Sequence, residues 1–148
     1  KTVNIMKIVI GSDHAGVEYK AFLIKKLKKE GHDVQDVGPN SPASVDYPDY
    51  AHPVSQAVVG GQADLGILLC GSGNGVCMTA NKHKTIRAAL CWTPELAKLA
   101  RNHNDANIVC IPARFVSKIT AGRIANAFLT SDFERGRHQN RVDKIGNC

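Results

Sequence analysis

One stretch decides the fold: Ala63-Asp64-Leu65-Gly66-Ile67-Leu68-Leu69-Cys70-Gly71-Ser72-Gly73-Asn74-Gly75. An apolar run with the length of one buried strand, 64–70, ends in a cysteine, and three glycines fall within the next five residues. Such a loop brings backbone N–H groups close to an oxygen-rich ligand. A helix predicted over 74–82 directs its positive end at the loop, which favours a thiolate over a thiol. The segment therefore offers a base and a set of donors for developing negative charge.

Strands and helices alternate through the rest of the chain. Apolar or alternating runs predict further strands at 7–10, 32–37, 87–92 and 107–112. Start and stop signals predict helices over 15–29, from His52-Pro53 to Gly60-Gly61, from Thr93 onward, and around 121–128. In the helix after Thr93, we expect Leu96, Leu99 and Ala100 to be buried. The alternation predicts an α/β fold, a three-layer α/β/α Rossmann-like domain with a five-stranded parallel sheet.

Two segments lack regular patterning. Residues 39–49 are rich in Pro, Ser and Asp and are expected to form a loop. The tail beyond Asp132 is polar, and its stretch from Arg135 to Arg141 is basic without helical amphipathicity. We expect this tail to be ordered only if it packs against another surface.

Length and composition bound the class of protein. The chain has 148 residues, 43% apolar and 22% charged, which is typical of one globular domain. We assign the domain to 6–148 and interpret residues 1–5 as a short extension ahead of a natural start at Met6. No apolar run approaches the ~20 residues of a membrane span, and no signal peptide is recognisable. A cytoplasmic location is expected.

Charge and cysteine content narrow the candidate partners. The net charge of +6 admits a nucleic acid, an anionic surface or a small phosphorylated substrate. No basic face with interleaved aromatic residues supports nucleic-acid binding. The five cysteines are odd in number and form no CxxC pair, so neither a disulfide framework nor a zinc site is expected. We expect no metal and no cofactor.

Polar residues gather where strands of the predicted sheet end, the edge at which such folds bind ligands. Asp13-His14 follows the first strand, Cys70 to Gly75 the third and Trp92 the fourth, whereas His103 ends the next helix. Each also has a structural interpretation. Cys70 fits a small buried residue, and Ser72 and Asp13 fit helix caps. His103 and Asn104 fit a helix C-terminus, where a charged imidazole is stabilised.

The glycine loop matches none of three well-known phosphate sites. A Cys-x5-Arg phosphatase loop requires arginine where this chain has Val76. A response regulator carries an aspartate in place of Cys70. A dinucleotide fingerprint follows the first strand with the spacing Gly-x-Gly-x-x-Gly, whereas this loop follows the third.

Six motifs, in order, resemble one family, the type B ribose-5-phosphate isomerases, grouped with the allose-6-phosphate and galactose-6-phosphate isomerases. They are Gly11-Ser12-Asp13-His14-Ala15-Gly16, Asp46-Tyr47-Pro48, Cys70-Gly71-Ser72-Gly73-Asn74-Gly75, Ala80-Asn81-Lys82, Arg101-Asn102-His103-Asn104-Asp105-Ala106-Asn107 and Gly136-Arg137-His138-Gln139-Asn140-Arg141. One branch of the family places a glutamate base where this chain has Val76. The chain therefore resembles the branch that uses cysteine.

The resemblance implies an aldose–ketose isomerase that interconverts D-ribose 5-phosphate and D-ribulose 5-phosphate without a cofactor, in the non-oxidative pentose phosphate pathway. It implies homodimers, or dimers of dimers, with active sites at the subunit interface. Cys70 is the implied base and His103 the implied acid for ring opening, and Ser72 and Asp13 are further catalytic candidates. The implied substrate and phosphate contacts are Asp13, His14, Tyr47, Gly71, Ser72, Gly73, Asn74, Gly75, Asn104, Arg114, Arg137 and Arg141.

The chemistry of the residues agrees with this resemblance. An enediol mechanism needs one base that moves a proton between adjacent carbons, and donors for the oxygen that becomes negative. Two alternatives stay open. One is a six-carbon substrate, allose or galactose 6-phosphate, within the same family. The other is a flavodoxin-like module that binds a nucleotide or a flavin without catalysis.

Overall fold

The computed structural model describes residues 4–148, and all five predicted strands are present. They are β1 (Lys7–Ser12), β2 (Asp33–Asp36), β3 (Leu65–Cys70), β4 (Ala88–Leu90) and β5 (Ile108–Pro112). Every pairing in the sheet is parallel, and the strand order is β2-β1-β3-β5-β4. The predicted five-stranded parallel sheet is therefore confirmed. The interpretation of residues 1–5 as an extension falls mostly on 1–3, which lie outside the described residues.

Six α-helices and one short 3-10 turn (His14–Gly16) accompany the sheet of the described chain. The helices are α1 (Val17–Lys29), α2 (Pro48–Val59), α3 (Asn74–Ala80), α4 (Pro94–Asn104), α5 (Lys118–Thr130) and α6 (Arg137–Ile145). Gly31 has a φ of 95° just beyond α1 and ends that helix as predicted. The Thr93 side chain accepts a hydrogen bond from the Leu96 N–H and caps α4.

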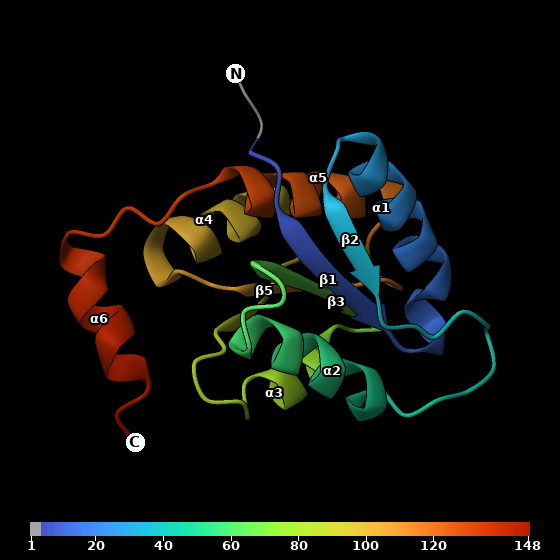
Figure 1. The fold of residues 1–148 in the computed structure, drawn as a ribbon, viewed down its shortest axis with the longest axis horizontal. Coiled ribbons are helices and arrows are strands. Elements are labelled where there is room, and N and C mark those ends of the chain that lie inside the picture. The colour runs from blue at the N-terminus through green and yellow to red at the C-terminus, as the bar shows by residue number, and fades with distance from the viewer. Residues whose placement is uncertain (1–3) are drawn as a thin grey trace.

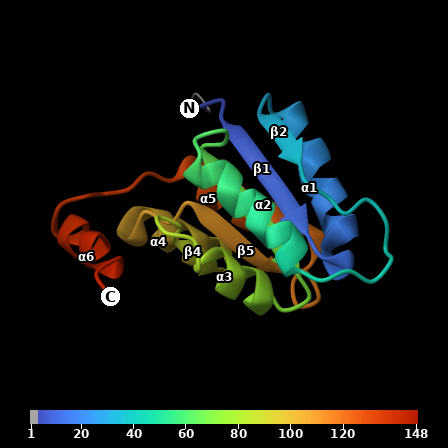
Figure 2. The same ribbon diagram turned by 60° about the horizontal axis from the view of Figure 1, so that its bottom comes forward.

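Five of the six helices form two layers, one on each face of the sheet (Figure 1 and Figure 2). One apolar cluster joins the sheet to α1, α4 and α5, and a second joins its other face to α2 and α3. The central strands β1, β3 and β5 are almost fully buried between these layers, with Ile8, Ile67 and Ile108 each at most 1% exposed, whereas β2 and β4 at the two sides of the sheet are partly exposed. This three-layer arrangement explains why the central strands have continuous apolar sequences, whereas β2 at the side of the sheet alternates.

Three local predictions are wrong, and each has a physical reason. The second helix begins at Pro48, not near Pro53, because Pro48 takes the first-turn position and Pro53 is tolerated inside the helix. Leu96 and Leu99 are 45% and 38% exposed, since α4 packs on α5 through the small residue Ala97 and its neighbours. The basic stretch in the tail is amphipathic, contrary to the prediction, whereas the expectation that an ordered tail packs against another surface is confirmed.

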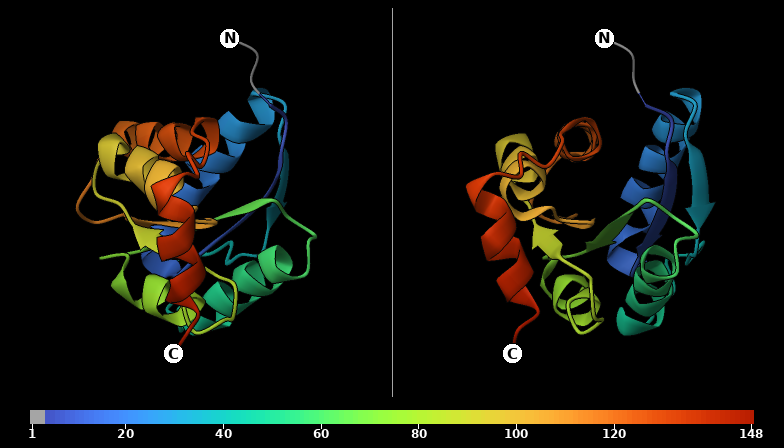
Figure 3. Two further views of the ribbon diagram at one scale, coloured as in Figure 1. Left: turned by 90° about the vertical axis from the view of Figure 1, so that its left-hand side faces the viewer. Right: turned by 60° about the vertical axis from the view of Figure 1, so that its left-hand side comes forward.

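That tail forms α6, which lies outside the two layers beside α4 at one end of the molecule (Figure 3). It buries His138 and Val142, four residues apart, and exposes Arg137 and Arg141 with the same spacing. The basic stretch therefore does have two faces. The periodicity was hidden because a histidine, rather than an apolar residue, occupies the first buried position.

The parallel sheet has two functionally different edges. The carboxyl ends of β1, β3 and β5 meet at one edge, where Ser12 is in register with Leu69 and Cys70 with Pro112. Because α4 runs back across the sheet, its last residues lie at the opposite, amino edge, just before β5 begins. The four residue steps from Ile108 to Pro112 separate the two edges by about 13 Å. None of the helices among the described residues is both long and apolar enough to cross a membrane.

Candidate active site

Cys70 ends β3 at the carboxyl edge and forms part of a hollow of about 500 Å³. Its side chain is nearly buried, and its sulfur accepts a hydrogen bond of 3.2 Å from the backbone N–H of Gly73. Two further thiols of the sheet region, Cys91 and Cys110, are buried. Burial raises the pKa of Cys91 to about 12 and that of Cys110 well above its usual range. Cys91 and Cys110 therefore stay protonated near neutral pH. A hydrogen bond from Cys110 lowers the pKa of Cys77, but Cys77 does not line the hollow, so its position makes Cys70 the candidate base.

The glycine loop has a conformation that only glycine supplies easily. Gly73 has a φ of 78°, and a Cβ placed there would lie 2.4 Å from a methyl group of Leu90. The Ser72 hydroxyl accepts a hydrogen bond of 3.2 Å from the Asn74 N–H. Gly73, not Ser72, occupies the capping position of α3 and makes no side-chain cap. The hydroxyl hydrogen of Ser72 thus remains available to a ligand in the hollow, as the prediction of a donor requires.

Asp13 and His14 directly follow β1, the neighbour of β3 in the sheet, and lie at the same carboxyl edge as Cys70. One carboxylate oxygen of Asp13 accepts hydrogen bonds from the Ala15 and Gly16 N–H groups at 2.9 and 3.2 Å, so the predicted cap is confirmed. Asp13 also lines the Cys70 hollow. The Val45 N–H donates to Nδ1 of His14 at 3.2 Å. Because Nδ1 accepts this hydrogen bond, a neutral His14 ring carries its hydrogen on Nε2, which can then donate to a ligand.

Tyr47 and Arg114 form the walls of the same hollow, together with Met78 and Phe115, which sequence reasoning missed. The Tyr47 ring packs so closely on Gly75 that a Cβ there would lie 2.6 Å from the ring. The Arg114 N–H donates to the Gly71 carbonyl at 3.0 Å, and the guanidinium lies against Gly71. A cationic group is therefore held at the rim of the glycine loop.

His103 and Asn104 lie elsewhere, in the last turn of α4 at the amino edge. The motif around them is largely structural. Arg101 binds the Asp105 carboxylate at 3.0 Å and the Ala106 carbonyl at 2.7 Å, and Asp105 takes the left-handed conformation that ends the helix. These contacts fix the turn that carries His103.

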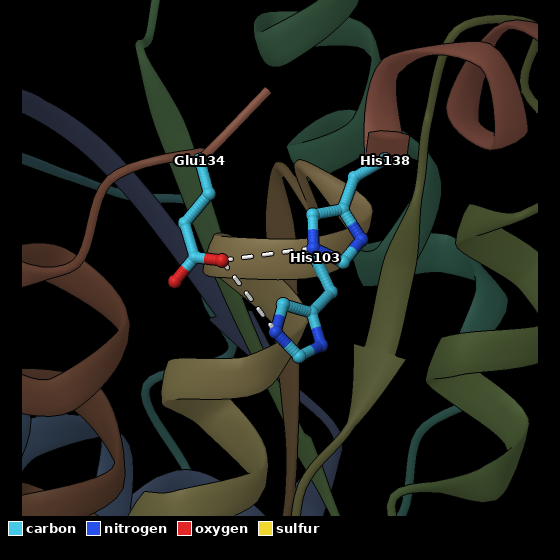
Figure 4. Close-up of side chains that lie close together, drawn as sticks. All are labelled: His103, Glu134 and His138. Atoms are coloured by element: carbon cyan, nitrogen blue, oxygen red, sulfur yellow. Dashed lines mark ion pairs between the residues drawn. The ribbon is translucent and has the colours of Figure 1, made fainter. Parts of the chain in front are cut away.

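Two residues from the tail meet His103 (Figure 4). Glu134 is anchored by its N–H, which donates to the Asn102 carbonyl at 2.9 Å. Its Oε1 lies 3.7 Å from Nε2 of His103 and 3.6 Å from Nε2 of His138. The two imidazole rings stack at a centroid distance of 4.3 Å. Loss of solvent around the ring, followed by the charges of His103 and Arg137, lowers the pKa of His138.

The predicted site residues therefore fall into two groups in one chain. The carboxyl-edge group comprises Asp13, His14, Tyr47, Gly71, Ser72, Gly73, Asn74, Gly75, Arg114 and Cys70. The amino-edge group comprises His103, Asn104, Arg137 and Arg141, on α4 and α6. Glu134 escaped sequence reasoning, although its spacing of four from His138 was visible. A further hollow of about 530 Å³ at the amino edge is lined by residues 81–87 and α6. The Cys70 hollow is the candidate active site because a cysteine sulfur and backbone N–H groups meet there.

Comparison with known proteins gives one consistent result. The family model described as Ribose/Galactose Isomerase matches residues 8–145. The protein of Escherichia coli strain K12 named ribose-5-phosphate isomerase B is 43% identical over 139 residues, which cover 94% of this chain and 93% of that protein.

Solved structures agree along nearly the whole chain. A ribose 5-phosphate isomerase from Thermotoga maritima matches with a TM-score of 0.96 and 46% identity, covering 98% of this chain and 100% of that one. Ribose-5-phosphate isomerase B from Mycoplasma genitalium, solved with bound ribulose-5-phosphate, matches with a TM-score of 0.91 and 44% identity, covering 99% of this chain and 97% of that one.

Proposed function

Because the chain belongs to the ribose/galactose isomerase family, we propose that it interconverts D-ribose 5-phosphate and D-ribulose 5-phosphate through an enediolate intermediate. The observation that carries the proposal is the Cys70 sulfur, seated in a hollow and contacted by the Gly73 N–H. The mechanism belongs to the cysteine branch, since Val76 follows the glycine loop and has no acidic group. This activity places the protein in the non-oxidative pentose phosphate pathway.

Proton transfer is assigned to Cys70. The thiolate removes the proton from C2 of the open-chain aldose, which leaves an enediolate with its charge on the C1 oxygen. A proton then moves from the C2 hydroxyl to the C1 oxygen, and the thiol returns its own proton to C1 to give the ketose. Negative charge develops on the oxygen of C1 during the first step. The N–H groups of the glycine loop and the Ser72 hydroxyl are fixed donors for that oxygen. Asp13 lines the same hollow and is placed to hold a substrate hydroxyl.

The phosphate group requires cationic and neutral donors away from the reacting carbons. His14 offers Nε2–H, while Arg114 lies at the rim of the hollow. Arg137 and Arg141 are exposed on one face of α6, and their guanidinium groups match the geometry of a phosphate. Binding energy from this remote group positions the sugar over Cys70.

A second copy of the chain supplies the amino-edge group. Within one chain, His103, Asn104, Arg137 and Arg141 lie at the opposite edge of the sheet from Cys70. In a two-fold dimer, each copy presents its own α4–α6 end to the hollow of the other, which completes two identical sites. His103 then acts as the acid that opens the furanose ring.

Exposed apolar side chains support the dimer. Trp92 and Phe115 pack with tilted rings at a centroid distance of 5.1 Å, and Phe115 lines the Cys70 hollow, yet the two residues are 43% and 60% exposed. Leu96 and Leu99 on α4 and Ile119 on α5 add to the exposed apolar surface. Apolar patches of this kind on a small protein favour burial against a partner.

The test follows the interconversion of the two pentose phosphates, with EDTA present, for the wild type and Cys70→Ala. We expect turnover only in the wild type, with both proteins binding a phosphorylated substrate analogue. Near wild-type turnover of Cys70→Ala refutes the base assignment and directs the search to Asp13.

The family also includes enzymes for six-carbon sugars, so allose 6-phosphate and galactose 6-phosphate are the second candidates. Comparison of kcat/KM on the five- and six-carbon substrates decides between them. A higher value on a hexose phosphate overturns the proposed substrate while keeping the reaction class.

A further inference from the structure

The Glu134 carboxylate faces two imidazole nitrogens at distances that suit a bridging ion better than a hydrogen bond. Its Oε1 lies 3.7 and 3.6 Å from Nε2 of His103 and His138. These separations exceed the range of N–H···O hydrogen bonds. They lie close to the separation of about 3.4 Å between two ligands of a tetrahedral zinc ion with bonds near 2.1 Å. The ligand atoms of all three residues lie within 4.8 Å of one another.

The donor set selects a class of metal ion. Two imidazoles and one carboxylate suit borderline transition ions such as Zn²⁺ and Co²⁺, whereas Mg²⁺ and Ca²⁺ prefer oxygen ligands. Three protein ligands leave the fourth tetrahedral position open to water or to a substrate oxygen. The positive charges of Arg137 and Arg141 act on His138 and oppose a dication. The carboxylate of Glu134 offsets one of these positive charges. The imidazole–metal bonds must supply the remaining free energy of binding.

Only small movements complete the ligand geometry. The imidazole rings are nearly parallel, at 11°, so they must tilt toward each other for both nitrogens to reach one ion. His103 and Glu134 have the freedom to do so, because their side chains are 38% and 54% exposed. The backbone positions are firm, since Glu134 is bonded to the Asn102 carbonyl and His138 is packed on the inner face of α6.

We propose that His103, Glu134 and His138 form a binding site for a zinc-class transition ion, and that occupancy of this site inhibits the enzyme. The site rests on the geometry of one chain alone. The inhibition rests on the proposed function, because an ion bound to His103 occupies the imidazole that is proposed to open the furanose ring. Bound metal would also draw the phosphate oxygens away from Arg137 and Arg141.

Binding is tested first, with Co²⁺ as a spectroscopic probe of the intact protein. We expect one ion per chain with the visible absorption of four-coordinate cobalt and no thiolate-to-metal band in the near ultraviolet. Glu134→Gln and His138→Gln each weaken binding at least about tenfold, since even outer partners of metal ligands contribute that much. The matched control is His83→Asn, which removes a histidine from the exposed His52–His83 pair, and we expect it to bind Co²⁺ like the wild type.

Three results overturn the site: a thiolate band, equal affinity of Glu134→Gln and wild type, or a loss of binding in His83→Asn as large as in His138→Gln. Thermal unfolding of each variant shows whether it is folded. Zn²⁺ is then added to the isomerase assay and removed again with EDTA, and each protein is compared with its own metal-free rate. We expect reversible inhibition of wild type and much weaker inhibition of Glu134→Gln. Bound Co²⁺ without inhibition by Zn²⁺ keeps the site but refutes the blocking of His103, and with it the acid role proposed for that residue.

Discussion

Mixing two inactive variants tests whether the active site is shared between two copies. Cys70→Ala destroys the carboxyl-edge group of a chain and His103→Asn the amino-edge group. About 13 Å of strand separates these edges in one chain. A mixed dimer has one site with both defects and one site with neither, since each site takes one group from each copy. Random pairing of equal amounts makes half of the dimers mixed, and half of their sites intact. Activity therefore rises from near zero to about a quarter of wild type.

The assay co-expresses the two variants with different affinity tags, or unfolds and refolds them together, and then measures pentose phosphate isomerisation. Each variant processed alone in the same way is the control. Purification through both tags isolates the mixed dimer, whose activity we expect to be about half that of wild type. A mixed dimer as inactive as its parents refutes the shared site and requires His103 to act within its own chain or not at all.

Three further predictions concern stability. Gly73→Ala lowers the free energy of unfolding, measured in urea, by about 3 kcal/mol, because of the left-handed φ of 78° and the contact with a β4 leucine. The control Gly61→Ala, at a φ of 80° in open space, lowers it by only about 1 kcal/mol. Equal losses in the two variants contradict the packing argument. Burial and then His52 lower the pKa of His83 below 6.5, so the unfolded state binds more protons and stability falls as the pH drops from about 7 to 5. His83→Asn makes stability less dependent on pH. An unchanged slope of stability against pH excludes the His52–His83 pair as the source of that dependence. Lys20→Met leaves the Asp36 carboxylate, 2.8 Å away, without its cation and lowers the free energy of unfolding by about 2 kcal/mol. A change within experimental error shows that the ion pair makes no net contribution to stability.

Much of the fold was predictable because its signals are local. The apolar runs, the Thr93 cap and the stop at Gly31 depend on residues close in sequence, and the structure confirms each. The errors arose where a distant surface decides. Leu96 and Leu99 look buried by periodicity, but α5 accepts the alanine face of α4 instead. The amphipathicity of α6 depends on a buried histidine, His138, that packs against His103 of α4, and the sequence alone does not indicate this contact.

The sequence by itself determined the order of strands and helices, the glycine loop after Cys70 and the six motifs that resemble one family. These features depend on backbone conformation and on residues that are neighbours along the chain. Only the tertiary structure decided which motifs meet. It placed Cys70 and Asp13 at one edge of the sheet and His103 at the other, and it brought Glu134 against two histidines. The physical reason is that α3 and α4 run antiparallel to the strands, so the first three motifs lie at the carboxyl edge and the last three at the amino edge.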